Sequence, residues 1–242
     1  MKHCLVVSPH LDDAALSAST QLGAGGVTVV TLFSAIPSAD WPTTWWDRLT
    51  GAASSRDRQA ARQAEDAAAM RLLGAKSIYL DELELLYRDS VPDLSAATVS
   101  LAECFRDAAD IWLPAAIGGH PDHVMTRDAG LRAAAVSGRT EVTLYADYPY
   151  VLRHGWPPSL TGQAPTPFID ADYWLAYQLA QAGLDTAVLE PELVVLDPAQ
   201  RALKSEVIRA YESQTAALSL APADLAADPA KLDYELRWKI RQ

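Results

Sequence analysis

Five short apolar runs alternate with longer segments of helical spacing over the first 145 residues, and this alternation constrains the fold more than any other feature. The runs cover residues 3–7, 27–33, 76–80, 110–114 and 141–145. The runs at residues 3–7 and 27–33 have the aliphatic and β-branched side chains that are typical of strands buried inside a parallel sheet. Between them lie segments with helical spacing or helix-ending glycines, at residues 14–22, 56–73, 95–110 and 123–137. The order predicts an α/β fold, a Rossmann-like three-layer sandwich with a mostly parallel sheet and right-handed crossovers.

The chain beyond residue 145 is less regular. Residues 171–182 fit a helix better than a strand, residues 192–196 a late strand, and residues 198–213 a helix. Two irregular segments, 34–55 and 147–170, are long for a compact domain, and long loops of this kind are usually functional or disordered. Their tryptophans and prolines favour ordered walls around a pocket.

Neither an internal repeat nor a low-complexity linker interrupts the chain. We therefore expect one domain over residues 1–242, with a motif-bearing part at about 2–214 and a terminal segment, 222–242, packed back on it. Within the helix expected at residues 56–73, alanines recur at helical spacing. We expect this small-residue face to pack on the sheet and the charged face to lie outside.

Composition excludes several classes of partner. Half of the residues are apolar and 21% are charged, which is the composition of a globular domain. The net charge of −11 argues against nucleic acid and against an anionic membrane surface, because both are bound by clustered Lys and Arg. No apolar run is long enough for a membrane span, and the first apolar run is too short for a signal peptide. A cytoplasmic location is expected. Cys4 and Cys104 are expected to be small buried hydrophobes.

Two polar clusters, residues 8–13 and 119–123, directly follow the first and the fourth apolar runs. They hold three of the five histidines of the chain. Because an open α/β sheet binds its ligands at the carboxyl ends of its strands, both clusters are expected at one edge of the sheet. The separation of the clusters is too long for a zinc finger and fits a site assembled from two crossover units.

The two clusters resemble the paired motifs of the PIG-L/LmbE-like zinc-dependent N-deacetylases. The matching residues are Ser8-Pro9-His10-Leu11-Asp12-Asp13 and Gly119-His120-Pro121-Asp122-His123. Further resemblance lies in Arg62-Gln63-Ala64-Glu65 with Leu73-Gly74, in Tyr145-Ala146-Asp147-Tyr148-Pro149-Tyr150, and in Lys204 with Tyr211-Glu212-Ser213-Gln214. It implies a metal-dependent hydrolase that removes an N-acyl group, usually acetyl, from an amino sugar or an amino-sugar-containing small molecule.

The resemblance also implies roles for single residues. One divalent metal, with Zn²⁺ favoured and Fe²⁺ or Co²⁺ as alternatives, would be held by His10, Asp13 and His123. A zinc-bound water would be the nucleophile, because the metal lowers the pKa of that water towards about 7. Asp12 would act as general base, and His120 as oxyanion stabiliser and general acid.

Other residues are expected to support this site. Asp122 is expected to accept an N–H from a histidine and so fix its orientation. Substrate contacts are expected from Arg62, Trp45, Trp46, Tyr148, His154 and Trp156. Some have a plainer interpretation: Arg62 as a solvated helix charge, Trp45 and Trp46 as anchors of their loop, and His154 as an exposed loop histidine.

Two other classes of function fit the same pattern. One is a small-molecule-binding or regulatory protein on this fold, metal-loaded but inactive, although such a protein would have no need to keep Asp12 and His120. The other is a metal-dependent phosphoesterase, although such enzymes commonly use two metals and the clusters offer ligands for one. A homo-oligomer is left open by the sequence.

Overall fold

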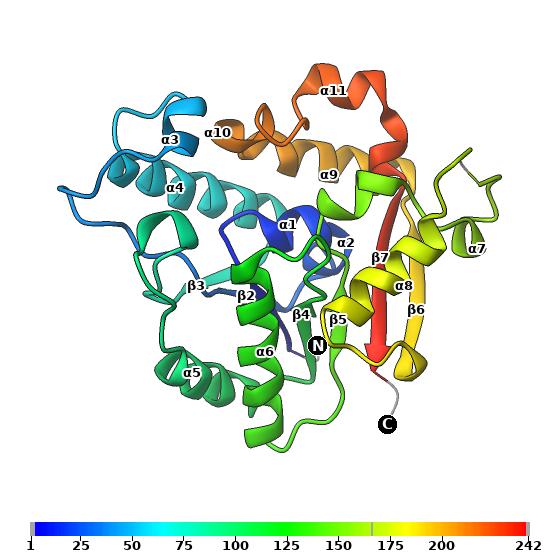
Figure 1. Ribbon diagram of the computed structural model, residues 1–242, viewed down its shortest axis with the longest axis horizontal. Coiled ribbons are helices and arrows are strands. Elements are labelled where there is room, and N and C mark those ends of the chain that lie inside the picture. The colour runs from blue at the N-terminus through cyan, green and yellow to red at the C-terminus, as the bar shows by residue number, and fades with distance from the viewer. Residues whose placement is uncertain (1–2, 166, 241–242) are drawn as a thin grey trace.

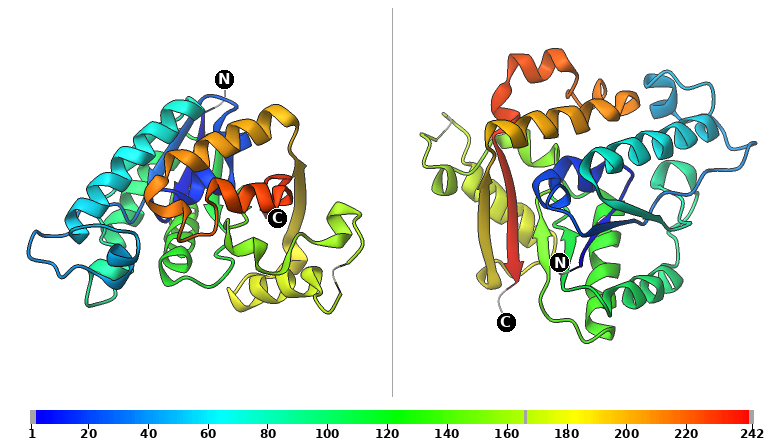
Figure 2. Two further views of the ribbon diagram at one scale, coloured as in Figure 1. Left: turned by 90° about the horizontal axis from the view of Figure 1, so that it is seen from above. Right: turned by 180° about the vertical axis from the view of Figure 1, so that it is seen from behind.

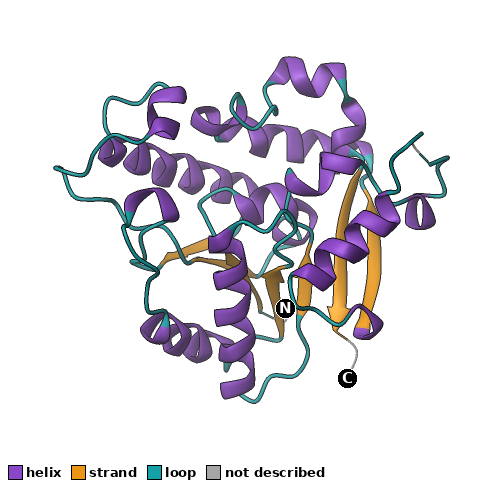
Figure 3. Cartoon of the chain, in the orientation of Figure 1, coloured by secondary structure: helices purple, strands orange, loops and turns teal. Residues whose placement is uncertain are grey.

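A seven-stranded, mostly parallel sheet forms the centre of the molecule (Figures 1 and 3). The computed structural model describes residues 3–165 and 167–240, without the side chain of His154. The strand order is β3-β2-β1-β4-β5-β7-β6. The strands are β1 Cys4–Ser8, β2 Val27–Thr31, β3 Lys76–Tyr79, β4 Asp110–Pro114, β5 Thr143–Tyr145, β6 Leu189–Val195 and β7 Tyr234–Ile240. The first five strands are parallel, while β7 is antiparallel to both β5 and β6.

Helices cover both faces of the sheet, which confirms the predicted three-layer α/β sandwich. The α-helices are α1 Asp13–Ser17, α2 Ser19–Leu22, α3 Trp45–Leu49, α4 Ser55–Leu73, α5 Ser95–Phe105, α6 Pro121–Val136, α7 Pro158–Thr161, α8 Ala171–Gln181, α9 Pro198–Ala210, α10 Glu212–Thr215 and α11 Pro222–Ala227. Four short 3₁₀ segments are η1 Leu85–Tyr87, η2 Tyr150–His154, η3 Thr186–Val188 and η4 Pro229–Leu232. Figure 2 shows α4 and α9 on one side of the sheet and α6 and α8 on the other.

The strand order reverses between β1 and β4, and this point positions the candidate site. The chain moves outward from β1 to β2 and β3, then returns through α5 to β4 on the other side of β1. At such a switch point the connections from the two central strands leave in opposite directions and open a crevice at their carboxyl ends. Both polar clusters of the sequence follow these two strands directly.

Several predicted elements differ from the structure in length. The helix expected at 14–22 is broken into α1 and α2 at Ala18, whose φ of −135° and ψ of 36° are not helical. The helix expected at 95–110 ends at Phe105, and its N-cap is Leu94, with Ser95 as its first residue. The helix expected at 198–213 is divided into α9 and α10 at Tyr211.

The terminal strand β7 was not predicted. Residues 234–240 alternate apolar and polar side chains, and this period of two is the signal for a strand. In the sheet, Leu236 and Trp238 are buried, while Lys239 is exposed. The terminal segment therefore extends the sheet and does more than pack back on it.

The prediction for the buried face of α4 was wrong. The alanine face is largely accessible, with Ala60, Ala64 and Leu72 exposed. The buried side chains are mostly polar: Ser55, Arg58, Gln59, Arg62, Asp66, Ala69, Met70 and Leu73. Burial of polar groups is tolerated where each finds a partner. Here Tyr211 and Tyr79 each donate a hydrogen bond to Asp66, at 2.8 Å.

No helix in the described ranges has the length and apolar character needed to cross a bilayer. Of the two cysteines, Cys4 is buried in β1 as expected, and Cys104 is half-buried.

Candidate metal and catalytic site

The turn after β1 is closed by its own side chains. Ser8 Oγ donates to the carbonyl of His10 at 2.6 Å and accepts from the amide of Ala14 at 3.0 Å. The carboxylate of Asp13 then accepts from the amide of His10 at 2.9 Å. Local hydrogen bonds of this kind compete well with regular structure in short polar turns. The turn therefore holds His10 and Asp13 on the same side before any contact with the second cluster is made.

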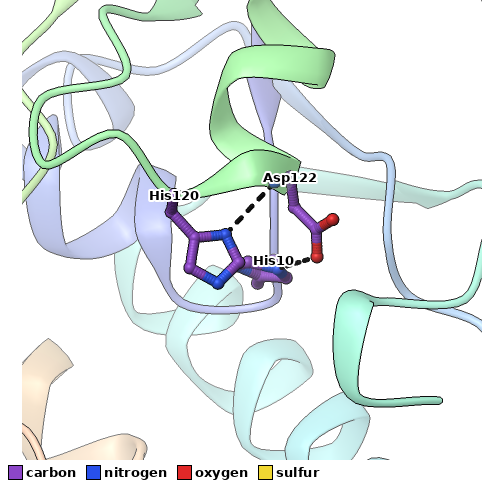
Figure 4. Close-up of side chains that lie close together, drawn as sticks. All are labelled: His10, His120 and Asp122. Carbon is purple, nitrogen blue, oxygen red and sulfur yellow. Dashed lines mark hydrogen bonds and ion pairs between the residues drawn. The ribbon is translucent and has the colours of Figure 1, made fainter. Parts of the chain in front are cut away.

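The second cluster begins α6. His120 is the N-cap, and its Nδ1 accepts from the amide of Asp122 at 3.2 Å. Pro121 occupies the first turn, where its missing N–H costs nothing. The helix then directs Asp122 and His123 inward, and both side chains are fully buried. Figure 4 shows His120 and Asp122 at the start of this helix beside His10 from the first cluster.

His10, Asp13 and His123 are brought together into one compact group. Asp13 Oδ2 lies 3.0 Å from His10 Nδ1 and 3.2 Å from His123 Nε2. His123 Nε2 is buried and has no hydrogen-bond partner among the described residues. One ligand atom from each of the three residues lies within 4.8 Å of the others. Two imidazoles and a carboxylate, with a buried nitrogen that faces the carboxylate without a hydrogen bond, fit a three-ligand divalent metal site. His10, His120 and Asp122 form a second group that meets the same distance criterion.

Two carboxylates hold the imidazole rings from behind. Asp122 Oδ2 lies 3.0 Å from His10 Nε2, and Asp147 Oδ1 lies 2.7 Å from His123 Nδ1. Asp147 also accepts from the amide of Ile117 at 2.8 Å. Such carboxylate–imidazole contacts fix the ring orientation in metal sites. Asp122 was expected in this position, whereas the contact of Asp147 was not predicted. The contact of Asp147 could have been suspected from its position shortly after the fifth apolar run, at the same edge of the sheet.

The carboxylates determine the protonation of His123. Burial lowers the pKa of this imidazole, but Asp13 and Asp147 outweigh burial and raise the pKa to about 9. In turn, burial raises the pKa of Asp13, while His123 and His10 together hold it well below its ordinary value. The imidazole and carboxylate groups therefore stabilise one another's charged forms, and the carboxylate of Asp13 is anionic where a cation would bind.

Asp12 and His120 differ from the ligand group in their electrostatic surroundings. Burial and the adjacent Asp13 raise the pKa of the Asp12 carboxyl, against the lowering effect of Arg62. Burial and the other two histidines lower the pKa of His120 to about 4. A pKa this low favours the neutral ring of His120 at pH 7, whereas the general-acid role expected from the sequence needs the protonated ring. With Nδ1 accepting a hydrogen bond, its N–H lies on Nε2.

Arg62 is a buried part of the site, and its interpretation as a solvated helix charge is wrong. The residue is 5% exposed. Its guanidinium lies 2.7 Å from Glu84 and 3.6 Å from Asp12. A buried guanidinium is stable only when carboxylates compensate its charge, and two do so here. Arg62 thereby links α4 to the proposed general base.

The segment from Glu84 to Arg88, which contains η1, supports the site from outside the motifs. The amide of Leu85 donates to Asp122 at 2.9 Å, and Arg88 pairs with the other oxygen of that carboxylate. Arg88 also lies over the ring of Phe33, 4.9 Å from its centroid. The sequence did not indicate this role of the segment, because the contacts join residues more than thirty positions apart.

A cavity of about 430 Å³ opens over these groups. Of the residues expected to contact substrate, Arg62, Trp45, Trp46 and Tyr148 line it. The hydroxyl of Tyr148 donates to the carbonyl of Lys231 at 3.3 Å, so only its ring forms the wall. Unpredicted lining residues include Glu84, Leu85, Leu86, Tyr150, Gln214 and Leu218.

Two of the expected substrate contacts are not brought to this cavity. Trp156 lines a separate, smaller cavity and packs on Tyr234, with ring centroids 5.6 Å apart. Its Nε1 donates to the carbonyl of Ala230 at 3.3 Å, which is the behaviour of a loop anchor. The side chain of His154 lies outside the described part of the structure.

The switch point, the His–Asp–His group and the adjacent carboxylate of Asp12 define an α/β protein with a site of the kind that metal hydrolases use. Residues 5–134 match the family model described as PIG-L: GlcNAc-PI de-N-acetylase, and the chain belongs to this family. The resemblance read from the two motifs is thus confirmed.

Three similar proteins are deacetylases. The chain is 33% identical over 162 residues to the 2'-N-acetylparomamine deacetylase of Streptomyces fradiae; the match covers 60% of this chain and 57% of that protein, a little over half of its length. The crystal structure of the A40926 pseudoaglycone deacetylase Dbv21 has 27% identity and a TM-score of 0.65, covering 99% and 98% of the two chains. The zinc-inhibited form of the teicoplanin deacetylase Orf2 has 24% identity, a TM-score of 0.71 and coverage of 98% and 97%, and supports the fold.

Proposed function

We propose that this protein is a metal-dependent hydrolase that removes an N-acyl group, usually acetyl, from an amino sugar or an amino-sugar-containing small molecule. The observation that carries the proposal is the buried group of His10, Asp13 and His123 with Asp12 beside it. Family membership and the deacetylase activity named for two of the similar proteins, the 2'-N-acetylparomamine deacetylase and Dbv21, support the same reaction.

His10, Asp13 and His123 would hold one divalent ion, with Asp122 and Asp147 fixing the two rings. The ion would supply Lewis acidity and make water a better nucleophile near neutral pH. Zn²⁺ is the first choice for two imidazoles and a carboxylate. Fe²⁺ and Co²⁺ bind the same donors, and the zinc-inhibited form of a similar deacetylase makes them necessary comparisons.

Two residues beside the ligands have separate roles: Asp12 carries the proton, and His120 stabilises the developing negative charge. Asp12, with its raised pKa, accepts a proton from the attacking water. The Nε2–H of neutral His120 donates a hydrogen bond to the acyl oxygen as negative charge develops on it. The C–N bond then breaks, and the proton held by Asp12 passes to the leaving nitrogen, which gives a free amine and a carboxylic acid that releases its proton to solvent. Arg62 keeps Asp12 in place, at 3.6 Å.

The test combines metal analysis with turnover. We expect about one metal per chain by elemental analysis, and amine release from N-acetylated sugars that stops on chelation and returns on reloading. Asp12 and Asp13 form a matched pair for substitution. Asp12→Asn should keep the metal and lose at least about 100-fold in rate, the scale of a general base. Asp13→Asn should lose both metal and activity.

The outcomes distinguish the alternatives. Loss of metal in Asp12→Asn, with the fold intact, would make Asp12 a ligand. Metal without amine release from any sugar would favour a binding protein. Phosphate release from phosphate esters without amine release would favour a phosphoesterase.

A further inference from the structure

The charges around the cavity are already paired with one another. Arg62 is the one Lys or Arg side chain among the described residues that line the cavity, and it lies between Glu84 and Asp12. Arg88, behind the wall, is paired with Asp122. Sites for phosphate or carboxylate groups instead offer free guanidinium or ammonium donors.

The formal charge of the site leads to the same conclusion. Five carboxylates, of Asp12, Asp13, Glu84, Asp122 and Asp147, meet the two guanidinium groups of Arg62 and Arg88. A divalent ion would still leave these groups with one negative formal charge. A substrate that carried a phosphate near the sugar would therefore add unbalanced negative charge beside buried carboxylates, where repulsion is weakly screened.

The mouth of the cavity is aromatic and aliphatic. Trp45 is 61% exposed although it lines the cavity. Its ring meets that of Trp46 edge-on, with centroids 5.5 Å apart, and Trp46 Nε1 donates to Gln214 at 3.2 Å. Leu85 and Leu218 add to the same wall. A large exposed indole beside an apolar wall is a common feature of ligand sites.

The helix that carries these tryptophans is rigidly held. Asp47, on α3, is fully buried, and its carboxylate accepts from Ser55 Oγ at 2.6 Å and from Tyr87 OH at 2.9 Å. The same carboxylate accepts from Thr44 Oγ1 at 2.7 Å. Trp45 is therefore presented by a fixed element, and a ligand that packs on it pays little ordering entropy.

From the paired charges and this fixed aromatic mouth, we propose that the preferred substrate is an N-acyl amino sugar joined to an uncharged aromatic aglycone that packs on Trp45, and not a sugar joined to a phosphate. This inference rests on the proposed function, since it places the N-acyl group at the metal site. The sugar fills the base of the cavity and the aglycone covers its mouth.

The test uses three glycosides of N-acetylglucosamine with the metal-loaded protein: the 4-nitrophenyl glycoside, the methyl glycoside and the 1-phosphate. We expect kcat/KM for amine release to be at least about 10-fold higher for the aryl than for the methyl glycoside, a ratio typical of one aromatic contact. The 1-phosphate should fall below the methyl glycoside. Trp45→Ala should reduce the aryl-to-methyl ratio to within about 3-fold.

Leu49→Ala is the matched control, because Leu49 lies on the same helix, is 65% exposed and does not line the cavity. It should keep the aryl-to-methyl ratio of the unsubstituted protein. Equal kcat/KM for aryl and methyl glycosides, or a preference for the 1-phosphate, would overturn the inference.

Calorimetric binding of the same three compounds separates this inference from the proposed function. If no compound releases amine, the proposed function fails. Tighter binding of the aryl glycoside, weakened by Trp45→Ala and not by Leu49→Ala, would still support the aromatic site. Equal binding of all three compounds would overturn it.

Discussion

Arg88 lies outside the two motifs and forms an ion pair with Asp122. Its side chain is 9% exposed, and that of Asp122 is fully buried. Arg88→Met keeps the length and the contact with Phe33 but leaves a buried carboxylate without its cation. Breaking a buried ion pair from one side costs about 3–5 kcal/mol. Because Leu85 and His10 still donate to Asp122, we expect the lower end, about 3 kcal/mol of unfolding free energy.

The substitution should also weaken metal binding. Asp122 orients His10, at 3.0 Å, and loss of such an outer contact typically costs 10–100-fold in metal affinity. Unfolding in urea without metal gives the first quantity, and competition with a chromophoric chelator gives the second. Arg127→Met is the control: the Arg127 side chain is 4% exposed and so also buried, but its partner Asp128 is 42% exposed and keeps its hydration. If Arg88→Met lost under about 1 kcal/mol of unfolding free energy and bound metal with unchanged affinity, the reasoning would be refuted.

Two further predictions concern Asp66 and Gly118. Burial raises the pKa of Asp66 to about 6 from 3.8, so the folded chain keeps a proton that the unfolded chain releases. The unfolding free energy should therefore fall by about 3 kcal/mol in total as pH rises between these values. Urea unfolding at several pH values should show a smaller fall for Asp66→Asn than for the unsubstituted protein. Parallel pH profiles for the two proteins would contradict this prediction. A Cβ at Gly118, where φ is +89°, would lie 2.5 Å from Tyr150 Cδ1. Gly118→Ala should lose about 2–4 kcal/mol of unfolding free energy and impair turnover. Gly119 also has a positive φ but open space where a Cβ would lie, so Gly119→Ala should lose about 1 kcal/mol. Equal losses for the two variants would show that the contact with Tyr150 is not the cause.

The fold was predictable because its signals are local. Each of the five parallel strands is a short apolar run, and the crossover helices follow from spacing and helix-ending glycines. The assembly of the two motifs was predictable for a related reason. Parallel strands end at one edge of the sheet, so His10 and His123, far apart in sequence, had to approach each other if β1 and β4 were neighbours.

The partners of the site were less predictable, because they depend on single long-range contacts. Neither Glu84 nor Arg88 follows a motif, and their roles depend on carboxylates and guanidiniums that only the fold brings near. Tyr150 reaches the pocket because Gly118 has no side chain. Spacing rules describe which face of an element is apolar, and they carry no information about which charge will meet which.

Helix α4 buries its polar face and exposes its alanine face, and it shows why spacing rules fail at this site. Burying the side chains of Arg62 and Asp66 without partners would destabilise the fold, because each group would lose its hydration. The cost is offset only because Glu84, Asp12 and two tyrosine hydroxyls converge on that face. An apolar face would have packed more simply against the sheet, but it would have left Asp12 without the guanidinium that holds it. The polar burial of α4 is therefore best explained by what it fixes, the carboxylate beside the ligand group, and not by the stability of the helix.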